Sequence, residues 1–253
     1  MINTRKVNLF GCEIDSLTMD ETVALVEKII HQRTPRQHVV VNAMKFAMMR
    51  SDPELKRVIN GCDLINADGL PVVWASHLLG TPLPARVAGV DLFLHLVEAA
   101  ARKGFRPFFF GARDHVLQTM VGVFKERYPQ LDVAGARHGY FLPEQEKQIA
   151  EQIRDSKADM LFVGISSPMK EKFLNHWMDL MQVPFCMGVG GSFDIVARIT
   201  RRAPMWMQNL GLEWLYRVLQ EPRRMWKRYA RTNPVFIWMV LKAYIHRWEA
   251  RVK

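Results

Sequence analysis

The chain has 253 residues, of which 49% are hydrophobic and 24% charged, as is typical of a globular protein with a substantial core. Lys and Arg outnumber Asp and Glu by 35 to 25, and the whole net charge of +10 lies in residues 198–253, where 13 basic residues accompany 3 acidic ones. The first residues lack an apolar signal segment, and no apolar run reaches the roughly 18 residues of a membrane-spanning helix, so we expect neither feature. The basic stretch predicts an anionic partner: a membrane surface, a phosphate-bearing substrate or a nucleic acid.

Short β-rich runs alternate with helical stretches along the first 200 residues. The runs predict strands at 37–41, 63–66, 106–110, 131–134, 159–163 and 184–188. The intervening stretches predict helices at 18–33, 90–103, 114–127, 143–156 and 169–181. Thr18 and Glu21 have the spacing of a capping box, and Asp114 is a suitable N-cap. This alternation predicts an α/β fold with a doubly wound, mostly parallel sheet.

The character of the chain changes near residue 200. We expect a catalytic domain over 1–200 and a helical, basic appendage over 201–253, with helices at 206–220, at 222–231 and from Asn233-Pro234 onward. In the last helix Ile237, Leu241, Tyr244 and Trp248 form one stripe, and Lys242, His246, Glu249 and Lys253 form another. This amphipathic pattern suits a helix lying in a membrane interface, but a helix packed on the parent domain has the same periodicity.

Cysteine usage and motif content exclude several classes of site. The three cysteines, Cys12, Cys62 and Cys186, form no CxxC pair, which argues against a disulfide framework and fits a reducing cytoplasm. The sequence has no GxxxxGK[ST] motif, no Asp-x-Asp pair and no His or Cys cluster with metal spacing. The turn at 188–191 lacks the third glycine of a dinucleotide fingerprint. If a diphosphate binds here, cations and helix N-termini must hold it.

Ligands of such sheets bind beyond the carboxyl ends of the strands, and glycine or small polar residues follow nearly every predicted strand. Asp68 follows one strand and precedes Gly69, so its carboxylate could accept a proton from an attacking hydroxyl; a turn or N-cap aspartate is the alternative. Asn42 could bind a sugar hydroxyl or bond its own turn. Arg86 could clamp a phosphate or be a surface arginine, Asp194 has the same ambiguity as Asp68, and Asp91 is expected to be an N-cap.

Taken together, these motifs resemble a known family. Their order along the chain is Asn42, Ala67-Asp68-Gly69, Arg86 with Gly89 and Asp91, Gly188-x-Gly190-Gly191-x-Phe193-Asp194, Arg202-Ala203-Pro204, Glu213-Trp214-Leu215-Tyr216-Arg217 and Glu221-Pro222-x-Arg224. From about residue 7 to 231 the chain resembles the WecG/TagA/CpsF family of bacterial glycosyltransferases. The resemblance implies a Rossmann-like core whose C-terminal appendage helps to close the site and touches the membrane.

The resemblance also implies a reaction. It is an inverting, metal-independent transfer, without a cofactor, of a hexose or N-acetylhexosamine from a UDP-sugar to an undecaprenyl-diphosphate-linked sugar in cell-surface polysaccharide synthesis. The expected location is cytoplasmic, attached to the inner face of the plasma membrane, with an anionic membrane surface as partner and no nucleic acid. A homo-oligomer is compatible with this assignment, but nothing in the sequence identifies an interface.

Site residues follow from the motif match. Asp68 matches the family's proposed base, Asn42, Arg86 and Asp194 match substrate-site positions, and Arg217 and Arg224 match appendage arginines thought to reach the diphosphate. Helix N-termini near Gly111 and Gly190 would help to stabilise the charge on the leaving UDP, and Gly191 is a further expected substrate-binding residue.

Three positions depart from the family pattern. Lys170 stands where the family usually has Gln, Val40 replaces a common threonine, and Ala197-Arg198 replaces a glycine-containing linker. Such variants resemble the branch that builds exopolysaccharide repeat units, in which the donor could be a plain hexose such as glucose.

Three other interpretations remain open from the sequence. An NAD-dependent oxidoreductase would show a thermal shift with NAD and none with UDP. A nucleic-acid-binding module using the basic tail with Trp226, Tyr229 and Trp238 would show steep salt dependence on DNA or RNA. A catalytically idle assembly protein of a polysaccharide complex is the third interpretation.

Overall fold

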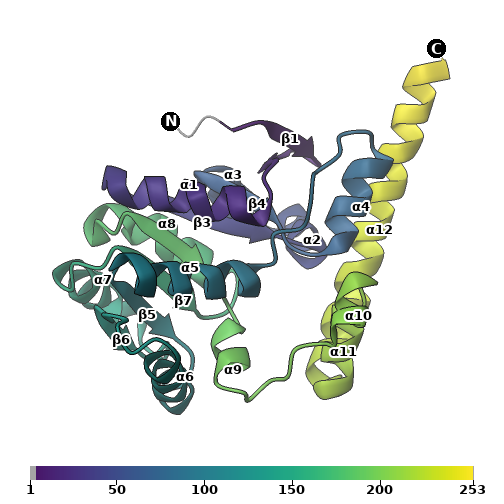
Figure 1. Ribbon diagram of the computed structural model, residues 1–253. Helices are drawn as coiled ribbons and strands as arrows, with labels where there is room; N and C mark the ends of the chain where they lie inside the picture. Colours follow the sequence, from purple (N-terminus) through teal and green to yellow (C-terminus); the bar gives the residue numbers. More distant parts are fainter. Residues whose placement is uncertain (1–3, 253) are drawn as a thin grey trace.

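A six-stranded parallel sheet forms the centre of the protein, in a computed structural model that describes residues 4–252 (Figure 1). Its strands are β3 (Arg36–Val41), β4 (Leu64–Ala67), β5 (Pro107–Gly111), β6 (Gly135–Arg137), β7 (Met160–Gly164) and β8 (Phe185–Gly188). They lie in the order β4-β3-β8-β7-β5-β6, and every neighbouring pair is parallel. The predicted α/β class with a doubly wound, Rossmann-like sheet is therefore confirmed.

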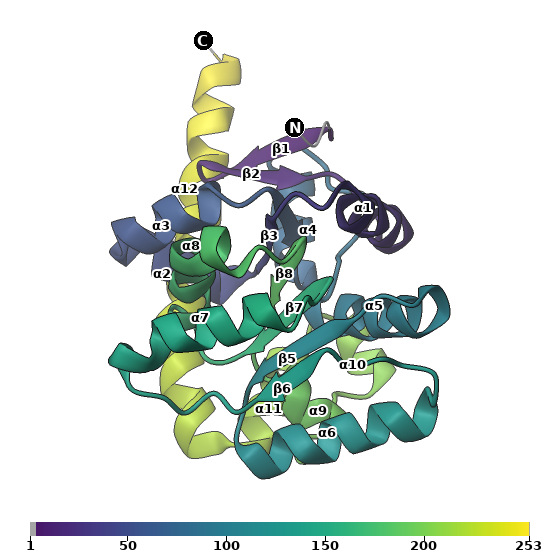
Figure 2. The ribbon, with the colours of Figure 1, turned by 90° about the vertical axis from the view of Figure 1, so that its left-hand side faces the viewer.

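Helices cover both faces of this sheet (Figure 2). One face carries α1 (Met19–Gln32), α5 (Gly89–Lys103), α6 (Asp114–Arg127) and α9 (Ser192–Val196), and the other carries α7 (Glu146–Asp155) and α8 (Met169–Met181). Successive strand residues point to opposite faces, so Phe109 packs with Phe93 on the first face while Phe108 and Phe110 belong to the core of the second. This two-sided burial explains why β5 is an unbroken apolar run.

Several elements near the N-terminus were not predicted. They are the antiparallel hairpin β1 (Lys6–Leu9) and β2 (Cys12–Asp15), and the helices α2 (Ala43–Ser51), α3 (Pro53–Asn60) and α4 (Leu70–Leu78). The carboxylate of buried Asp15 accepts a hydrogen bond of 2.7 Å from the backbone N–H of Ile65, which attaches the hairpin to β4.

The predicted strand at 131–134 is wrong in position, because the strand that pairs with β5 is β6, which begins one residue after the predicted segment, at Gly135. Gly135 lies opposite Phe108, and a Cβ there would come within 2.5 Å of the Phe108 ring. The pairing therefore starts where the chain has no side chain to displace that ring. The stretch at 143–156 is a short 3₁₀ turn, η1 (Pro143–Gln145), followed by α7.

The capping box of Thr18 and Glu21 is confirmed, but two other caps are wrong. The N-cap of α5 is Ala88, and Asp91 lies in the first helical turn, where it pairs with Arg202 of the appendage. The N-cap of α6 is Arg113, and Asp114 is the first helical residue. Neither observed cap accepts a side-chain hydrogen bond, so composition alone could not locate them.

The appendage contains α10 (Met205–Asn209), α11 (Glu213–Gln220) and α12 (Pro222–Val252). The single helix predicted at 206–220 is interrupted at Gly211, whose φ of +68° suits glycine and which packs against the ring of Trp74. The break predicted at Asn233-Pro234 is also wrong, because α12 continues through Pro234. Buried Phe236, two residues after the proline, packs against Phe10 and Phe46, and this contact with the domain offsets the lost backbone hydrogen bond.

The last turns of α12 extend beyond the body of the protein (Figure 1). Phe236 faces inward against Phe10 and Phe46, whereas the stripe of Ile237, Leu241, Tyr244 and Trp248 is exposed. That stripe is therefore not packed onto the parent domain. Lys253, which the sequence places on the opposite stripe, lies outside the described residues. Within residues 4–252, no helix is both long enough and apolar enough to span a bilayer.

A buried ion pair joins α2 to α8 beside the end of β3. The Lys45 ammonium lies 2.9 Å from the Glu171 carboxylate and donates a 2.8 Å hydrogen bond to the carbonyl of Val40. Burial alone would raise the pKa of Glu171, but Lys45 and then Lys170 lower it from 4.5 to about 2. The folded protein therefore holds Glu171 charged throughout the neutral range.

Replacing Glu171 by Gln should destabilise the protein by about 3 kcal/mol at pH 7, because it leaves buried lysines without their counter-charge. The pKa of Glu171 is lower in the folded state, so its contribution is complete above about pH 4.5 and is lost as the pH falls toward 2. Urea unfolding of both proteins between pH 7 and pH 2 measures this difference. A gap that stays constant down to pH 2 would contradict the argument.

Candidate active site

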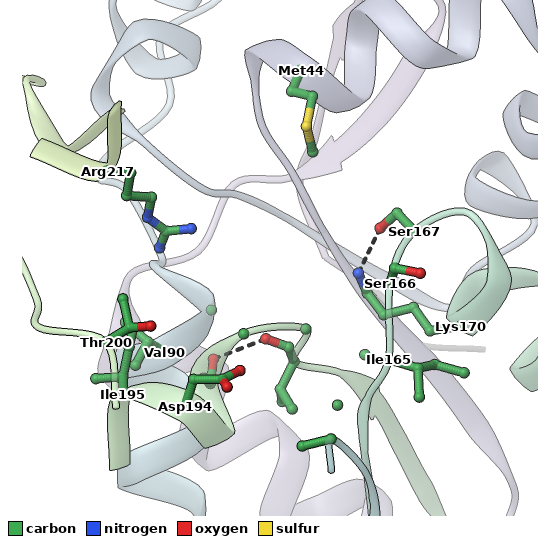
Figure 3. A pocket seen from close by; sticks show the side chains of 18 of the residues that line it. Met44, Val90, Ile165, Ser166, Ser167, Lys170, Asp194, Ile195, Thr200 and Arg217 are labelled. Carbon is green, nitrogen blue, oxygen red and sulfur yellow. Dashed lines mark hydrogen bonds between the residues drawn. The ribbon is translucent and has the colours of Figure 1, made fainter. Parts of the chain in front are cut away.

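A large cleft lies at the carboxyl edge of the parallel sheet, with a volume of about 1430 Å³. Its walls come from the segments that follow β3, β4, β5, β7 and β8, and from α11 and the first part of α12. Figure 3 shows Arg217 of α11 and Lys170 of α8 on opposite sides of this space, with Asp194 of α9 below them in the view. The carboxyl edge of the sheet and the C-terminal helices α11 and α12 therefore build one cavity between them.

Asp68 lies in this cleft, directly after β4. Its backbone N–H donates a 2.8 Å hydrogen bond to the carbonyl of Val41, and the next residue, Gly69, has a φ of +98° that favours glycine. The amide of Asn42 donates to the Asp68 carboxylate over 3.4 Å, while the Asn42 carbonyl oxygen accepts from the N–H of Lys45 and caps α2. Asn42 thus closes its own turn and also contacts the candidate base.

The electrostatic surroundings of Asp68 suit a proton acceptor. Burial raises the pKa of Asp68, and the nearby Glu213 carboxylate raises it further. Arg217, the Asn42 hydrogen bond and Lys45 act in the opposite direction but do not cancel the rise. A carboxylate with a raised pKa is a stronger base than an ordinary aspartate, so it accepts a proton from a hydroxyl group more readily.

Lys170 is nearly buried in the wall opposite Arg217. Its ammonium donates a 2.5 Å hydrogen bond to the Ser167 hydroxyl and lies 3.3 Å from the Glu171 carboxylate. Burial, followed by the neighbouring charge of Lys45, lowers the pKa of Lys170 to about 8. A Cβ at Gly188 would lie 2.8 Å from the Lys170 side chain, so the glycine after β8 leaves room for the lysine.

The segment after β8 forms the floor of the cleft. Gly190, Gly191 and Asp194 all line it, and the backbone carbonyl of Asp194 accepts hydrogen bonds from the N–H groups of Ile199 and Thr200. Gly111 does not line it, because a Cβ at this position would meet the backbone of Gly164 at 2.5 Å. Gly111 therefore allows close approach of two strands and does not itself face the cavity.

Arg86 is also absent from the cleft lining, and it bonds the appendage instead. Its guanidinium donates a 3.2 Å hydrogen bond to the Gln208 side chain and lies 4.0 Å from the Glu213 carboxylate. Nearby, Arg202 of the appendage makes a two-pronged contact with Asp91, one prong measuring 2.7 Å. The side chain of Arg224 lies outside the described residues, so its role stays a prediction.

Sequence reasoning missed two cleft residues, Glu213 and Lys45. Glu213 appeared there only as part of a motif, although its spacing of four residues from Arg217 predicts a helical ion pair, which the structure contains at 3.1 Å. Lys45 interrupts an apolar helix, and a charge in such a run indicates a buried pair.

The arrangement combines one carboxylate in position to take a proton with several cations that could hold phosphate groups. Among residues 4–252, no group of three or more His, Cys, Asp or Glu side chains could hold a metal ion.

Comparison with known proteins identifies the family. The model of the Glycosyl transferase WecG/TagA/CpsF family matches residues 7–250. A protein of Bacillus spizizenii named N-acetylglucosaminyldiphosphoundecaprenol N-acetyl-beta-D-mannosaminyltransferase is 36% identical over 191 residues, covering 76% of this chain and 73% of its own. A Staphylococcus aureus MW2 protein of the same name is 30% identical over 247 residues, or 95% of this chain and 94% of its own. The chain therefore belongs to the WecG/TagA/CpsF family of glycosyltransferases.

Proposed function

We propose that this enzyme transfers one sugar from a UDP-sugar to an undecaprenyl-diphosphate-linked sugar, with inversion and without a metal. The observation that supports this most directly is the position of Asp68, at the carboxyl edge of the parallel sheet and in the same cleft as Arg217 and Lys170. The acceptor class follows the names of the relatives, which are transferases that act on N-acetylglucosaminyl-diphosphoundecaprenol.

In this mechanism the acceptor hydroxyl lies beside Asp68. Its oxygen forms a bond to the anomeric carbon of the donor while the bond from that carbon to the UDP oxygen breaks, and Asp68 takes the hydroxyl proton. One in-line displacement inverts the anomeric configuration. Arg217 and Lys170 stabilise the charge that develops on the leaving diphosphate.

The donor is a hexose or an N-acetylhexosamine. The relatives transfer N-acetylmannosamine according to their names. The family resemblance implies that Lys170 stands where glutamine is usual. Because Lys170 projects into the cleft beside Gly190, it is in place to contact the donor and to alter which sugar is accepted.

We also propose that the enzyme attaches to the cytoplasmic face of the plasma membrane through the appendage. The exposed stripe of α12 supplies apolar and aromatic side chains, and residues 198–253 carry the entire net charge of the protein. Each cation near an anionic surface contributes about 1 kcal/mol to binding.

Asp68→Asn should lower kcat about 10²- to 10⁴-fold, because the amide cannot accept the hydroxyl proton. UDP binding should persist, since the substitution preserves the size of the side chain. Product formation from a panel of UDP-sugars and a short-chain lipid-diphosphate sugar, read by mass spectrometry, measures the effect. Asp179→Asn, at an exposed position of α8, is the matched control. Near-normal turnover by Asp68→Asn would remove Asp68 from this role.

Treatment with EDTA should leave the transfer rate unchanged, because cationic side chains take the place of a metal at the diphosphate. Arg217→Gln should instead lower kcat about 10²- to 10³-fold, as expected for loss of one charge-stabilising donor. Initial rates with EDTA, and with added Mg²⁺ or Mn²⁺, test this. Abolished activity that either ion restores would refute the metal-independent mechanism.

The double substitution Leu241→Ser with Trp248→Ser should weaken binding to anionic liposomes at least tenfold. Each buried apolar side chain of this size contributes roughly 1.5–3 kcal/mol. Turnover of a water-soluble acceptor should change little, because both positions lie beyond the cleft. Leu142→Ser, another exposed leucine, should leave liposome binding unchanged. Equal sedimentation of the double variant and the parent protein with liposomes would contradict the attachment.

A further inference from the structure

Glu213 joins the two parts of the protein at the edge of the cleft. It is the first residue of α11, and its carboxylate lies 3.1 Å from Arg217 on the same helix and 4.0 Å from Arg86 of the catalytic domain. The Glu213 and Arg86 side chains are 23% and 17% exposed, whereas Arg217 is 45% exposed. Glu213 and Arg86, the two less exposed groups, therefore form the fixed part of this contact, and Arg217 extends from it into the cleft.

The contact with Arg86 is held from a second direction. Arg86 also donates to the side-chain oxygen of Gln208, and the buried Gln208 amide donates a 2.7 Å hydrogen bond to the carbonyl of Ala203. Arg86 is thus fixed by α10 and α11 together. Glu213 is the group in this set that also lines the cleft containing Asp68.

Asp68 faces charged groups from several elements. Lys45 of α2, Arg217 of α11 and Arg202 before α10 are positive, Glu213 is negative, and the Tyr229 phenol of α12 lies near. Because Arg217 forms an ion pair with Glu213, its guanidinium is not attracted to the Asp68 carboxylate alone. If Glu213 lost its charge, Arg217 would be attracted to the Asp68 carboxylate and would make it a weaker base.

We propose that Glu213 is a positioning residue for the transfer reaction, which pairs with Arg217 so that this guanidinium lies near Asp68 without being drawn onto its carboxylate, and which links Arg217 to Arg86 across the junction of domain and appendage. The base and its neighbouring cation then have their working arrangement only when the appendage lies against the catalytic domain. The kinetic consequence rests on the proposed function, whereas the electrostatic consequence does not.

The electrostatic arm measures the titration of Asp68 directly. Carboxyl ¹³C NMR of the full chain with labelled aspartate, with the Asp68 signal assigned by its loss in Asp68→Asn, gives the pKa. The pKa of Asp68 in the parent protein is raised, and Glu213→Gln should lower it, because a like charge is removed and Arg217 is released. Glu126→Gln, an exposed carboxylate of α6 that does not line the cleft, should leave it unchanged.

The kinetic arm measures kcat against pH. The base is active above its pKa and is lost as the pH falls through it, so Glu213→Gln should move the acid limb to lower pH. The plateau kcat should fall roughly tenfold to a hundredfold, as expected when a catalytic group is misplaced. Glu213→Asp keeps the charge, so it should leave the acid limb near its original position with a partial loss of kcat.

An Asp68 titration that is identical in the parent protein and in folded Glu213→Gln would overturn the proposal. So would a fall in kcat without any shift of the acid limb, since that result indicates a purely structural role; thermal unfolding and UDP binding verify that the variant is folded. If the parent protein transfers no sugar, the proposed function fails, and the NMR titration still decides the role of Glu213.

Discussion

The parallel direction of all six central strands is the constraint on which the site depends. Because each strand must return through a helix on one face, every carboxyl end lies on the same edge of the sheet. Asn42, Asp68, Lys170 and Gly190, which are far apart in the sequence, meet there for this reason. The interiors of β5, β7 and β8 are apolar and buried on both faces, whereas β3 and β4 bury His38 and Asn66 as a hydrogen-bonded pair within the sheet.

The appendage is attached by two kinds of contact with different consequences. Phe236 buries apolar surface, at roughly 1.5–3 kcal/mol for a side chain of this kind, and with Met239 and Val240 holds α12 against the domain. The polar contacts of Arg202 with Asp91 and of Arg86 with Gln208 contribute less to stability, because they are partly exposed, but their geometry is directional. Apolar packing therefore keeps the appendage in place, and the arginine contacts determine which of its residues enter the cleft.

The sequence predicted those parts of the structure that depend on local pattern. The apolar runs located five of the six strands, the residue directly after a strand located Asn42 and Asp68, and the segment that follows β8 located Asp194, because strand ends and ligand sites coincide in this architecture. The family resemblance supplied the position of the appendage arginine that lines the cleft. These features need no knowledge of long-range contacts beyond the general rule for parallel sheets.

The errors came from contacts that local pattern does not contain. Asn233-Pro234 has the signature of a helix start, but α12 continues through the proline, and Phe236 packs on the domain directly after it. Arg86 was expected in the cleft. Its partners Gln208 and Glu213 are more than a hundred residues further along the chain, so the sequence pattern could not predict these contacts. Gly111 was expected to face the ligand, although a neighbouring strand occupies that side.

The distribution of charge in the cleft bears on which kind of chemical group binds there. Arg217 is matched by Glu213, whereas Lys45 and Lys170 share the single carboxylate of Glu171, so this buried cluster retains one positive charge. Burial of a charge without a counter-charge is costly, and the pKa of Lys170, lowered to about 8, reflects that cost. An anion that enters the cleft beside Lys170 would supply the missing charge and raise that pKa again. A neutral side chain at this position could not provide this interaction, so the charge of Lys170 favours an anionic group on this side of the cleft.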